Sequence, residues 1–250
     1  MKPYYEDEAV TIYCGDFRDV LGSFDPEAPP AVDLIVADPP YGVTSLAWDR
    51  WPDHWPALLT GLAPAMWVFG TLRTFMEHAP DFADWQMSQD IVWEKHNGSS
   101  LAADRFSRVH EQAVHFYRGR WADVYHAPVY TNDATPRTVR RKALPPQHQG
   151  ARGPSTYTSV DGGPRLMRSV IPVRSTHGYA ENETQKPVGI LTPLIEYGSP
   201  PGGLVLDPFM GSGSTLIAAR DSGRRAIGID IREDQCEIAA RRQQLGMSAA

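Results

Sequence analysis

Two short apolar runs in this chain each end in an Asp-Pro pair, LIVADPPYG at residues 34–42 and LVLDPFMGSGST at residues 204–215. Short runs rich in Val, Leu and Ile that stop at turn residues are typical of strands buried on both faces of a sheet. If these two strands are neighbours, their carboxyl ends open on one crevice, which is where open α/β sheets bind ligands. The pair of strand ends therefore constrains the chain to an α/β fold whose ligand site draws on both halves of the sequence.

The rest of the chain alternates between strand-like and helix-like segments, which predicts a doubly wound, mostly parallel sheet. The predicted strands are 11–14, 32–37, 65–69, 89–93, 111–117, 203–206 and 225–229, and the predicted helices are 53–62, 72–78, 188–197, 214–222 and 232–245. Pro187 is expected at the first helical position of its helix, and Pro193 is expected to kink or split that helix.

The composition is ordinary for a globular protein, with 42% hydrophobic and 22% charged residues. No apolar run approaches the roughly 20 residues that a membrane span needs, and the N-terminus lacks the apolar region of a secretory signal. The two cysteines, Cys14 and Cys236, are far apart in the sequence, and neither belongs to a pattern of metal-ligand residues. These features predict a cytoplasmic protein that has no metal site and no membrane partner.

Positive charge is concentrated in one part of the chain. Residues 105–174 hold 12 Lys or Arg and 4 Asp or Glu, a balance of +8, whereas the remaining residues hold 12 and 26, a balance of −14. Within this segment, residues 118–184 are rich in Pro, Gly, Thr and Arg and show little periodicity, which predicts an insertion. A basic insertion on an acidic body suits a polyanion-binding surface, and a solvated loop without a partner is the equal alternative from charge alone.

The loop after Asp207 favours one class of ligand over two others. A phosphate loop would need Gly-Lys-Ser/Thr, and GSGST has no lysine; a dinucleotide loop would need a third glycine, where this chain has Leu216. The acid at the loop entry repels a pyrophosphate and suits a cationic ligand. Asp230, at the end of the next strand, can accept hydrogen bonds from a ribose. S-adenosylmethionine, a sulfonium nucleoside, meets both conditions, and a glycine-rich turn without a ligand is the alternative.

The stretch DPPY fits methyl transfer to an exocyclic amino group. Such a nitrogen is a poor nucleophile because its lone pair is delocalised into the base. The Asp38 carboxylate and the Pro39 carbonyl can each accept one N–H, which localises the lone pair toward the methyl donor, and Pro39 and Pro40 fix the backbone. Tyr41 can stack on a base rotated out of the duplex. Transfer would be a direct displacement, and an ordinary Asp-Pro turn is the alternative.

Together these motifs resemble the amino-group DNA methyltransferases, which modify adenine N6 or cytosine N4, and the likeness spans almost the whole chain. DPPYG (38–42) is similar to the catalytic motif, DPFMGSGST (207–215) to the cofactor loop, TQKPVGILTPLIE (184–196) to the segment before it, and IYCGDFRDVL (12–21) to the N-terminal motif. VWEKHNG (92–98) and RVHEQAVHFYRG (108–119) resemble the strands after the catalytic motif. The catalytic motif comes first, an order typical of the permuted β class. One departure is Asp230, where the family often has the longer Glu.

The resemblance implies a Rossmann-like fold in permuted order, with a catalytic half at 1–118, a target-recognition insertion at 119–183 and a cofactor-binding half at 184–250. The catalytic residues would be Asp38, Pro39, Pro40 and Tyr41. The expected cofactor contacts are Asp16, Asp38, Lys186, Pro187, Asp207, Pro208, Phe209, Gly211, Gly213, Ser214, Thr215, Asp230 and Ile231, and the expected DNA contacts are Arg137, Arg140, Arg141, Lys142, Arg152 and Arg165.

Several residues have two interpretations. Lys186 would reach the cofactor carboxylate or a phosphate, or else be an exposed lysine at the start of a helix. His110 with Glu111 is favoured as a structural pair. Trp48, Trp51 and Trp55 would form a lid over the flipped base or pack in the core.

The resulting functional hypothesis is an S-adenosylmethionine-dependent DNA methyltransferase acting on adenine N6, because the acid at the start of DPPY is less typical of the cytosine enzymes. Cytosine N4 is the second candidate, and RNA is a lesser substrate. A binding module of the same fold without catalysis and a protein methylase are the alternatives from other classes. Double-stranded DNA is the expected partner. A homodimer would compensate for a short recognition region, and a cognate restriction endonuclease is left open.

Overall fold

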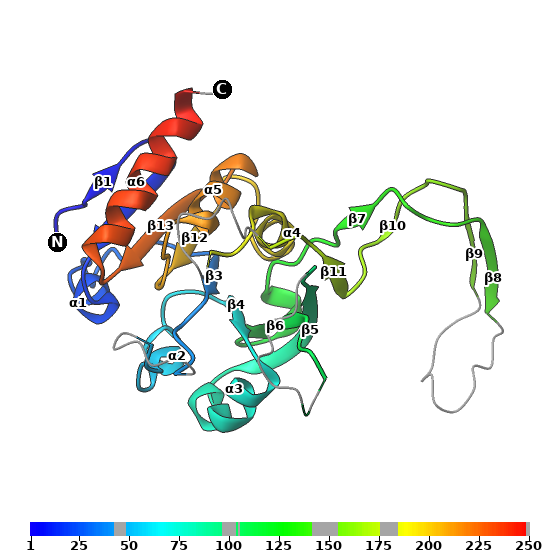
Figure 1. Cartoon of the computed structure of the whole chain (residues 1–250), viewed down its shortest axis with the longest axis horizontal. Coiled ribbons are helices and arrows are strands. Elements are labelled where there is room, and N and C mark those ends of the chain that lie inside the picture. Colours follow the sequence, from blue (N-terminus) through cyan, green and yellow to red (C-terminus); the bar gives the residue numbers. More distant parts are fainter. Residues whose placement is uncertain (43–48, 97–103, 105, 142–154, 176–184, 249–250) are drawn as a thin grey trace. The chain divides into compact units, whose positions relative to one another are not determined.

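A nine-stranded mixed sheet forms the centre of the larger part of the chain, with strands in the order β1-β2-β13-β12-β3-β4-β6-β5-β11 (Figure 1). The computed structural model describes residues 1–42, 49–96, 104, 106–141, 155–175 and 185–248. The strands of this sheet are β1 Tyr5–Glu6, β2 Val10–Cys14, β3 Leu34–Ala37, β4 Ala65–Gly70, β5 Gln86–Glu94, β6 His110–Tyr117, β11 Val170–Pro172, β12 Leu204–Asp207 and β13 Arg225–Asp230.

Neighbouring strands are parallel from β2 to β4 and again between β5 and β11, whereas β6 runs antiparallel to both β4 and β5. The strands β3, β4 and β12 are buried along their whole length because both faces of the sheet are covered. The predicted α/β class with a mostly parallel, doubly wound sheet is therefore confirmed.

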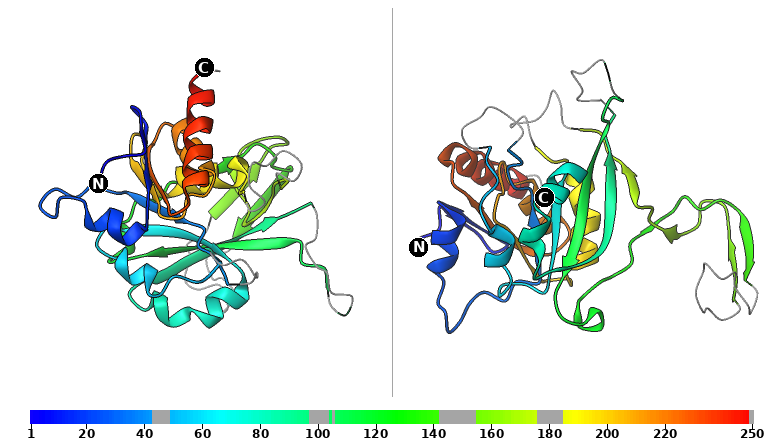
Figure 2. Two further views of the ribbon diagram at one scale, coloured as in Figure 1. Left: turned by 60° about the vertical axis from the view of Figure 1, so that its left-hand side comes forward. Right: turned by 90° about the horizontal axis from the view of Figure 1, so that it is seen from below.

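Helices cover both faces of this sheet (Figures 1 and 2). They are α1 Phe17–Gly22, α2 Trp55–Leu58, α3 Leu72–Glu77, α4 Val188–Gly198, α5 Ser214–Asp221 and α6 Glu233–Ser248, with short 3₁₀ turns η1 Ala79–Phe82 and η2 Trp121–Asp123. Side chains of α1, α2 and η1 join alternate residues of β3, β4, β12 and β13 in one core cluster. The helices α4, α5 and α6 contact each other in sequence and cover the other face, where the Trp67 indole N–H of β4 donates to the Leu194 carbonyl of α4 at 3.1 Å. No helix in the described part of the chain is long and apolar enough to cross a membrane.

Two of the predicted helices differ from the structure. The segment 53–62 forms only the single turn Trp55–Leu58, preceded by His54 in the left-handed region at φ 55°. The helix Val188–Gly198 is continuous through Pro193, and Pro187 is its N-cap, one residue earlier than predicted. An interior proline removes one hydrogen bond of a helix and crowds the preceding turn, yet the helix continues past Pro193 for more than one turn.

A second compact unit spans Pro128–Arg168, and the rest of the chain, Met1–Ala127 and Ser169–Ala250, forms the first. The second unit consists of two antiparallel ladders. One pairs β7 Tyr130–Thr131 with β10 Arg165–Leu166, and the other pairs β8 Arg137–Arg141 with β9 Ser155–Ser159. The second unit lies within the range 119–183 of the predicted insertion.

Candidate active site

Three aspartates lie at the carboxyl ends of three adjacent parallel strands. Asp38 follows β3, Asp207 ends β12 and Asp230 ends β13; β12 pairs with β3 on one side and with β13 on the other. The negative charges of Asp38 and Asp230 both help to raise the pKa of Asp207, so the three carboxylates share one local environment. The crevice expected from the two Asp-Pro strand ends is therefore an acidic site.

Asp38 has a partner on each carboxylate oxygen. The Tyr41 hydroxyl donates to Oδ1 at 2.5 Å, and the Lys186 ammonium donates to Oδ2. Pro39 is buried, and the Asp38 side chain keeps 24% of its surface exposed. Since each carboxylate oxygen has two lone pairs, the two oxygens still have capacity for a further donor from the open side.

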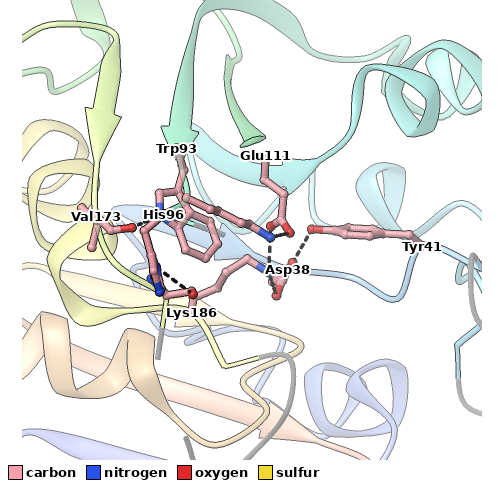
Figure 3. Close-up of polar contacts among 9 residues, drawn as sticks. Asp38, Tyr41, Trp93, His96, Glu111, Val173 and Lys186 are labelled. Atoms are coloured by element: carbon pink, nitrogen blue, oxygen red, sulfur yellow. Dashed lines mark hydrogen bonds and ion pairs between the residues drawn. The ribbon is translucent and has the colours of Figure 1, made fainter. Parts of the chain in front are cut away.

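Lys186 lies just before α4 and is largely buried, with 10% of its side chain exposed. Its ammonium contacts Asp38, and it also lies 3.4 Å from Glu111 Oε2 of β6 (Figure 3). Burial disfavours this ammonium, but the Asp38 and Glu111 carboxylates outweigh burial and raise the pKa of Lys186. The interpretation of Lys186 as an exposed lysine is therefore wrong.

Glu111 joins Lys186 to a second lysine. Its Oε1 accepts from the ammonium of Lys95, which follows β5. Burial alone would raise the pKa of Glu111, but Lys186 and Lys95 together lower it. The side chain of His110, by contrast, is exposed. The partners of Glu111 are thus lysines of the candidate site.

Asp207 is a buried carboxyl whose pKa is raised to about 7, chiefly by burial. Its Oδ1 accepts the Phe209 backbone N–H at 3.0 Å, and Thr215 of α5 also bonds to its side chain. A carboxyl held half-charged near neutral pH favours a positively charged ligand, since such a ligand would stabilise its ionised form.

The cofactor loop has the backbone that its glycines were expected to permit. Gly211 and Gly213 have φ of 50° and 77°, and a Cβ on Gly213 would come within 2.9 Å of the Cβ of Ala239. The Asp230 carboxylate accepts the backbone N–H groups of Gly211 at 3.0 Å and Arg232 at 2.9 Å. Asp230 therefore fixes the loop in addition to facing the site.

The remaining predicted cofactor residues surround these strand ends. Asp16 is the N-cap of α1, and Pro187 is buried at the start of α4. Pro208 is buried, and the ring of Phe209 lies edge-on to both Phe17 and Trp55, with centroids 5.3 Å apart in each case. Residues Ser214 and Thr215 are buried in the first turn of α5, and Ile231 is 64% exposed.

Of the predicted DNA contacts, Arg137 and Arg140 are exposed on β8, and Arg165 forms an ion pair with Asp133. Arg141 is described only as the last residue of β8, paired with Ser155. Lys142 and Arg152 lie outside the described residues.

The described members of the tryptophan cluster, Trp51 and Trp55, pack against the core and in it, respectively. Trp55 is fully buried and packs edge-on against Trp51 and Phe82, so it belongs to the core. The Trp51 ring stacks on His78 at 4.1 Å, and its indole N–H donates to Asp81. Trp48 lies outside the described residues.

Sequence reasoning did not identify Lys95 and Glu111 as site residues. A signal for the contact between them existed, because the predicted strands 89–93 and 111–117 could pair as antiparallel neighbours. In the observed register Trp93 lies opposite Glu111, which places Lys95, two residues further on, near Glu111. The contact of Glu111 with Lys186 could not be found from the sequence, since Lys186 precedes α4 and Glu111 lies on β6, far apart along the chain.

The geometry agrees with comparisons with known proteins. A sequence model of the N6/N4 DNA methylase family matches residues 32–241. The type II methyltransferase M.ScaI of Streptomyces caespitosus is 28% identical over 96% of this chain and 83% of its own length. The DNA adenine methyltransferase YhdJ of Escherichia coli K12 is 27% identical over 95% and 84%.

Two solved structures share the fold. The M1.HpyAVI–SAM complex has a TM-score of 0.63 at 23% identity, covering 93% of this chain and 99% of its own. The cytosine-N4-specific PvuII DNA methyltransferase has a TM-score of 0.64 at 15% identity, covering 96% and 88%.

Proposed function

This chain belongs to the N6/N4 DNA methylase family, and from that premise we propose that it transfers a methyl group from S-adenosylmethionine to N6 of adenine in DNA. The observation that carries the proposal is the meeting of DPPY and the cofactor loop at one sheet edge, with Asp38 and Asp207 on neighbouring strands. Cytosine N4 is the alternative acceptor within the same chemistry.

The site fits a cationic sulfonium nucleoside. Asp207 is buried beside two other carboxylates, an arrangement that a positive ligand would stabilise. The glycine backbone at 211 and 213 permits close approach of a ligand. We assign cofactor binding to this loop, to Asp230 for the ribose, and to the other predicted contacts around them, including Asp16 and Ile231. When bound, S-adenosylmethionine supplies an activated methyl group.

The residues of DPPY would prepare the acceptor nitrogen. The Asp38 carboxylate and the Pro39 carbonyl each accept one amino hydrogen, so that the nitrogen lone pair points at the methyl group. As the new N–C bond forms and the S–C bond breaks, the nitrogen releases one proton, and Asp38 is the base that we place beside it. Tyr41 would stack on the extruded base and hold it in place.

We further propose that residues 119–183 recognise the DNA sequence. In the chain they lie between the proposed catalytic half, 1–118, and the proposed cofactor-binding half, 184–250. The exposed Arg137 and Arg140 of the second unit would contact phosphates. A cytoplasmic location, a homodimer and a cognate endonuclease remain predictions of the same hypothesis.

The proposal is tested by expressing the chain in a host that lacks other DNA methylation and mapping modified bases at single-base resolution. We expect N6-methyladenine at one sequence context, and its complete loss in the Asp38→Ala variant, which should still bind S-adenosylmethionine. Asp84→Ala, at an exposed aspartate, is the matched control and should methylate as the wild type does.

If the mapping found N4-methylcytosine instead, cytosine would replace adenine as the proposed acceptor. If the wild-type chain modified no base in DNA while binding the cofactor, the catalytic proposal would fail.

A further inference from the structure

Four charged groups form a chain that leads from β5 to the proposed catalytic carboxylate. They alternate in sign, from Lys95 through Glu111 and Lys186 to Asp38, and each contacts the next. Figure 3 shows Lys186 reaching the carboxylates of Glu111 and Asp38. We call them the ion-pair chain. The side chains of Lys95, Glu111 and Lys186 are 17%, 12% and 10% exposed, so water screens these contacts only weakly.

Buried charged side chains are rare unless each is paired, because the free-energy cost of removing a charge from water exceeds the attraction of a poorly formed ion pair. Glu111 Oε2 is buried and lacks a hydrogen bond of good geometry, although the Lys186 ammonium lies 3.4 Å away. Lys186 also lies between two aromatic rings, 5.9 Å from the Tyr41 centroid and 5.3 Å from that of Phe69. The surroundings therefore hold the Lys186 ammonium in one place, directly against Asp38.

Asp38 needs such a partner because another acid lies near it. Asp207 of the neighbouring strand β12 interacts electrostatically with Asp38, and the Tyr41 hydroxyl is held as a neutral phenol, its pKa raised well above the ordinary value of 10 by burial and by the Asp38 charge. Arg108 contributes positive charge near Tyr41, and Lys186 is the cation in direct contact with the Asp38 carboxylate.

We propose that Lys186, anchored by Glu111 and Lys95, is a positioning residue that fixes the orientation of the Asp38 carboxylate so that it accepts the amino hydrogen of the target base. This inference rests on the methyl-transfer function proposed above. It gives Lys186 a role through Asp38, in place of the contact with the cofactor carboxylate that the sequence predicts.

The two roles of Lys186 are separated by measuring cofactor affinity and the rate of transfer at saturating cofactor in the same variant. S-adenosylmethionine binding is measured by calorimetry without DNA. Transfer of labelled methyl to unmethylated genomic DNA is followed at saturating cofactor.

We expect Lys186→Gln to slow transfer at saturating cofactor by at least about tenfold, because the Asp38 carboxylate loses the cation that fixes its orientation. Its cofactor affinity should equal that of the wild type. Lys186→Arg, which keeps the charge, should restore most of the rate. Lys2→Gln makes the same charge change at an exposed residue and is the matched control.

A second measurement tests whether Lys186 acts through Asp38. In an Asp38→Asn background the additional Lys186→Gln change should cause little further loss of rate, because the pair is already broken. Glu111→Gln should slow transfer at saturating cofactor as Lys186→Gln does, by less.

Either of two results would overturn the inference: a normal rate at saturating cofactor in Lys186→Gln, whether or not cofactor affinity falls, or a loss of rate from Lys186→Gln that is as large in the Asp38→Asn background as in the wild type. A wild-type chain that transfers no methyl group would instead refute the proposed function, so the two failures are distinguishable.

Discussion

At the scale of single residues, Asp207 has a charge state that departs far from that of an ordinary aspartate. Its carboxyl is buried at the end of β12, close to two other carboxylates, and its pKa of about 7 is far above the ordinary 3.8. The folded protein therefore holds a proton there that the unfolded chain releases. Strongly shifted pKa values of this kind cluster at functional sites, where a buried acid serves ligand binding or catalysis despite its cost in stability.

Asp207→Asn is expected to stabilise the protein at alkaline pH. Because the folded pKa is raised, the contribution of this group to stability is present below the unfolded value of 3.8 and is lost as pH rises toward 7. At about 1.4 kcal/mol per unit, the loss is on the order of 4 kcal/mol. Urea unfolding should therefore give the variant a higher free energy of unfolding above pH 7 and a similar one near pH 4.

The asparagine keeps an oxygen to accept the Phe209 N–H, so the local backbone should persist. Asp221→Asn, at an exposed aspartate, should show no such pH-dependent gain. A variant of Asp207 less stable than the wild type at every pH would contradict the prediction.

At the scale of elements, the turn from β12 to α5 combines a left-handed backbone with close packing. Gly213 is the N-cap of α5, at φ 77°, and faces Ala239 of α6. Gly228 on β13 is similarly crowded, since a Cβ there would lie 2.5 Å from Met210 Sδ. The loop is thus held between two elements, which fits a ligand site that is formed before the ligand arrives.

Gly213→Ala should destabilise the protein more than Gly223→Ala. Both glycines have positive φ, at 77° and 73°, but a Cβ on Gly223 would meet nothing within 4 Å. We expect about 1–2 kcal/mol for the backbone strain in each variant and about 1–3 kcal/mol more for overlap at Gly213. Thermal unfolding of the two variants measures the difference, and calorimetry should show weaker cofactor binding only in Gly213→Ala. Equal melting temperatures would show that α6 adjusts without cost.

For the molecule as a whole, charge and architecture divide in the same way. Residues 105–174, which contain the second unit, Pro128–Arg168, hold 12 of the 24 Lys and Arg residues but only 4 of the 30 Asp and Glu residues, whereas Asp38, Asp207 and Asp230 of the candidate site belong to the first unit. A net charge of −6 would otherwise repel DNA. The division lets one chain hold an acidic site for a cation and a basic surface for a polyanion.

Replacing both Arg137 and Arg140 by Ala should weaken duplex binding and reduce the slope of log affinity against log salt by about 2, since each phosphate contact contributes about 0.9. Cofactor affinity should not change. The double variant Arg73→Ala and Arg225→Ala removes the same charge from exposed positions of the first unit and should retain the wild-type slope. Equal slopes in all three proteins would remove Arg137 and Arg140 from the interface.

Seven strands of the main sheet were predictable because each is a short apolar run that ends at a turn residue, whereas β1, β11 and the strands of the second unit were not predicted. For example, the predicted 65–69 and 225–229 match Ala65–Gly70 and Arg225–Asp230 within one residue. The helix predicted over 53–62 was wrong because that segment is fixed by tertiary packing: Trp55 fills the core, and helical periodicity extends for one turn only. Local pattern specifies strands between turns better than it specifies short helices that depend on a core.

The candidate site was predictable in part for a related reason. Asp38, Asp207 and Asp230 each follow a recognisable strand, so their convergence follows from parallel neighbours. The partnership of Lys186 with Glu111 joins a loop before α4 to an antiparallel strand. No local pattern encodes that distance, and only the folded sheet brings the two residues together.

The position of β12 between β3 and β13 affects how the chain can acquire its structure during synthesis. Until the ribosome has released β12, one edge of β3 has no partner, and a nascent polypeptide carries an apolar strand open to association with other chains. Because Asp207 lies at the end of β12, a product truncated before β12 lacks one of the two aspartates. Such incomplete chains cannot form the proposed methyl-transfer site.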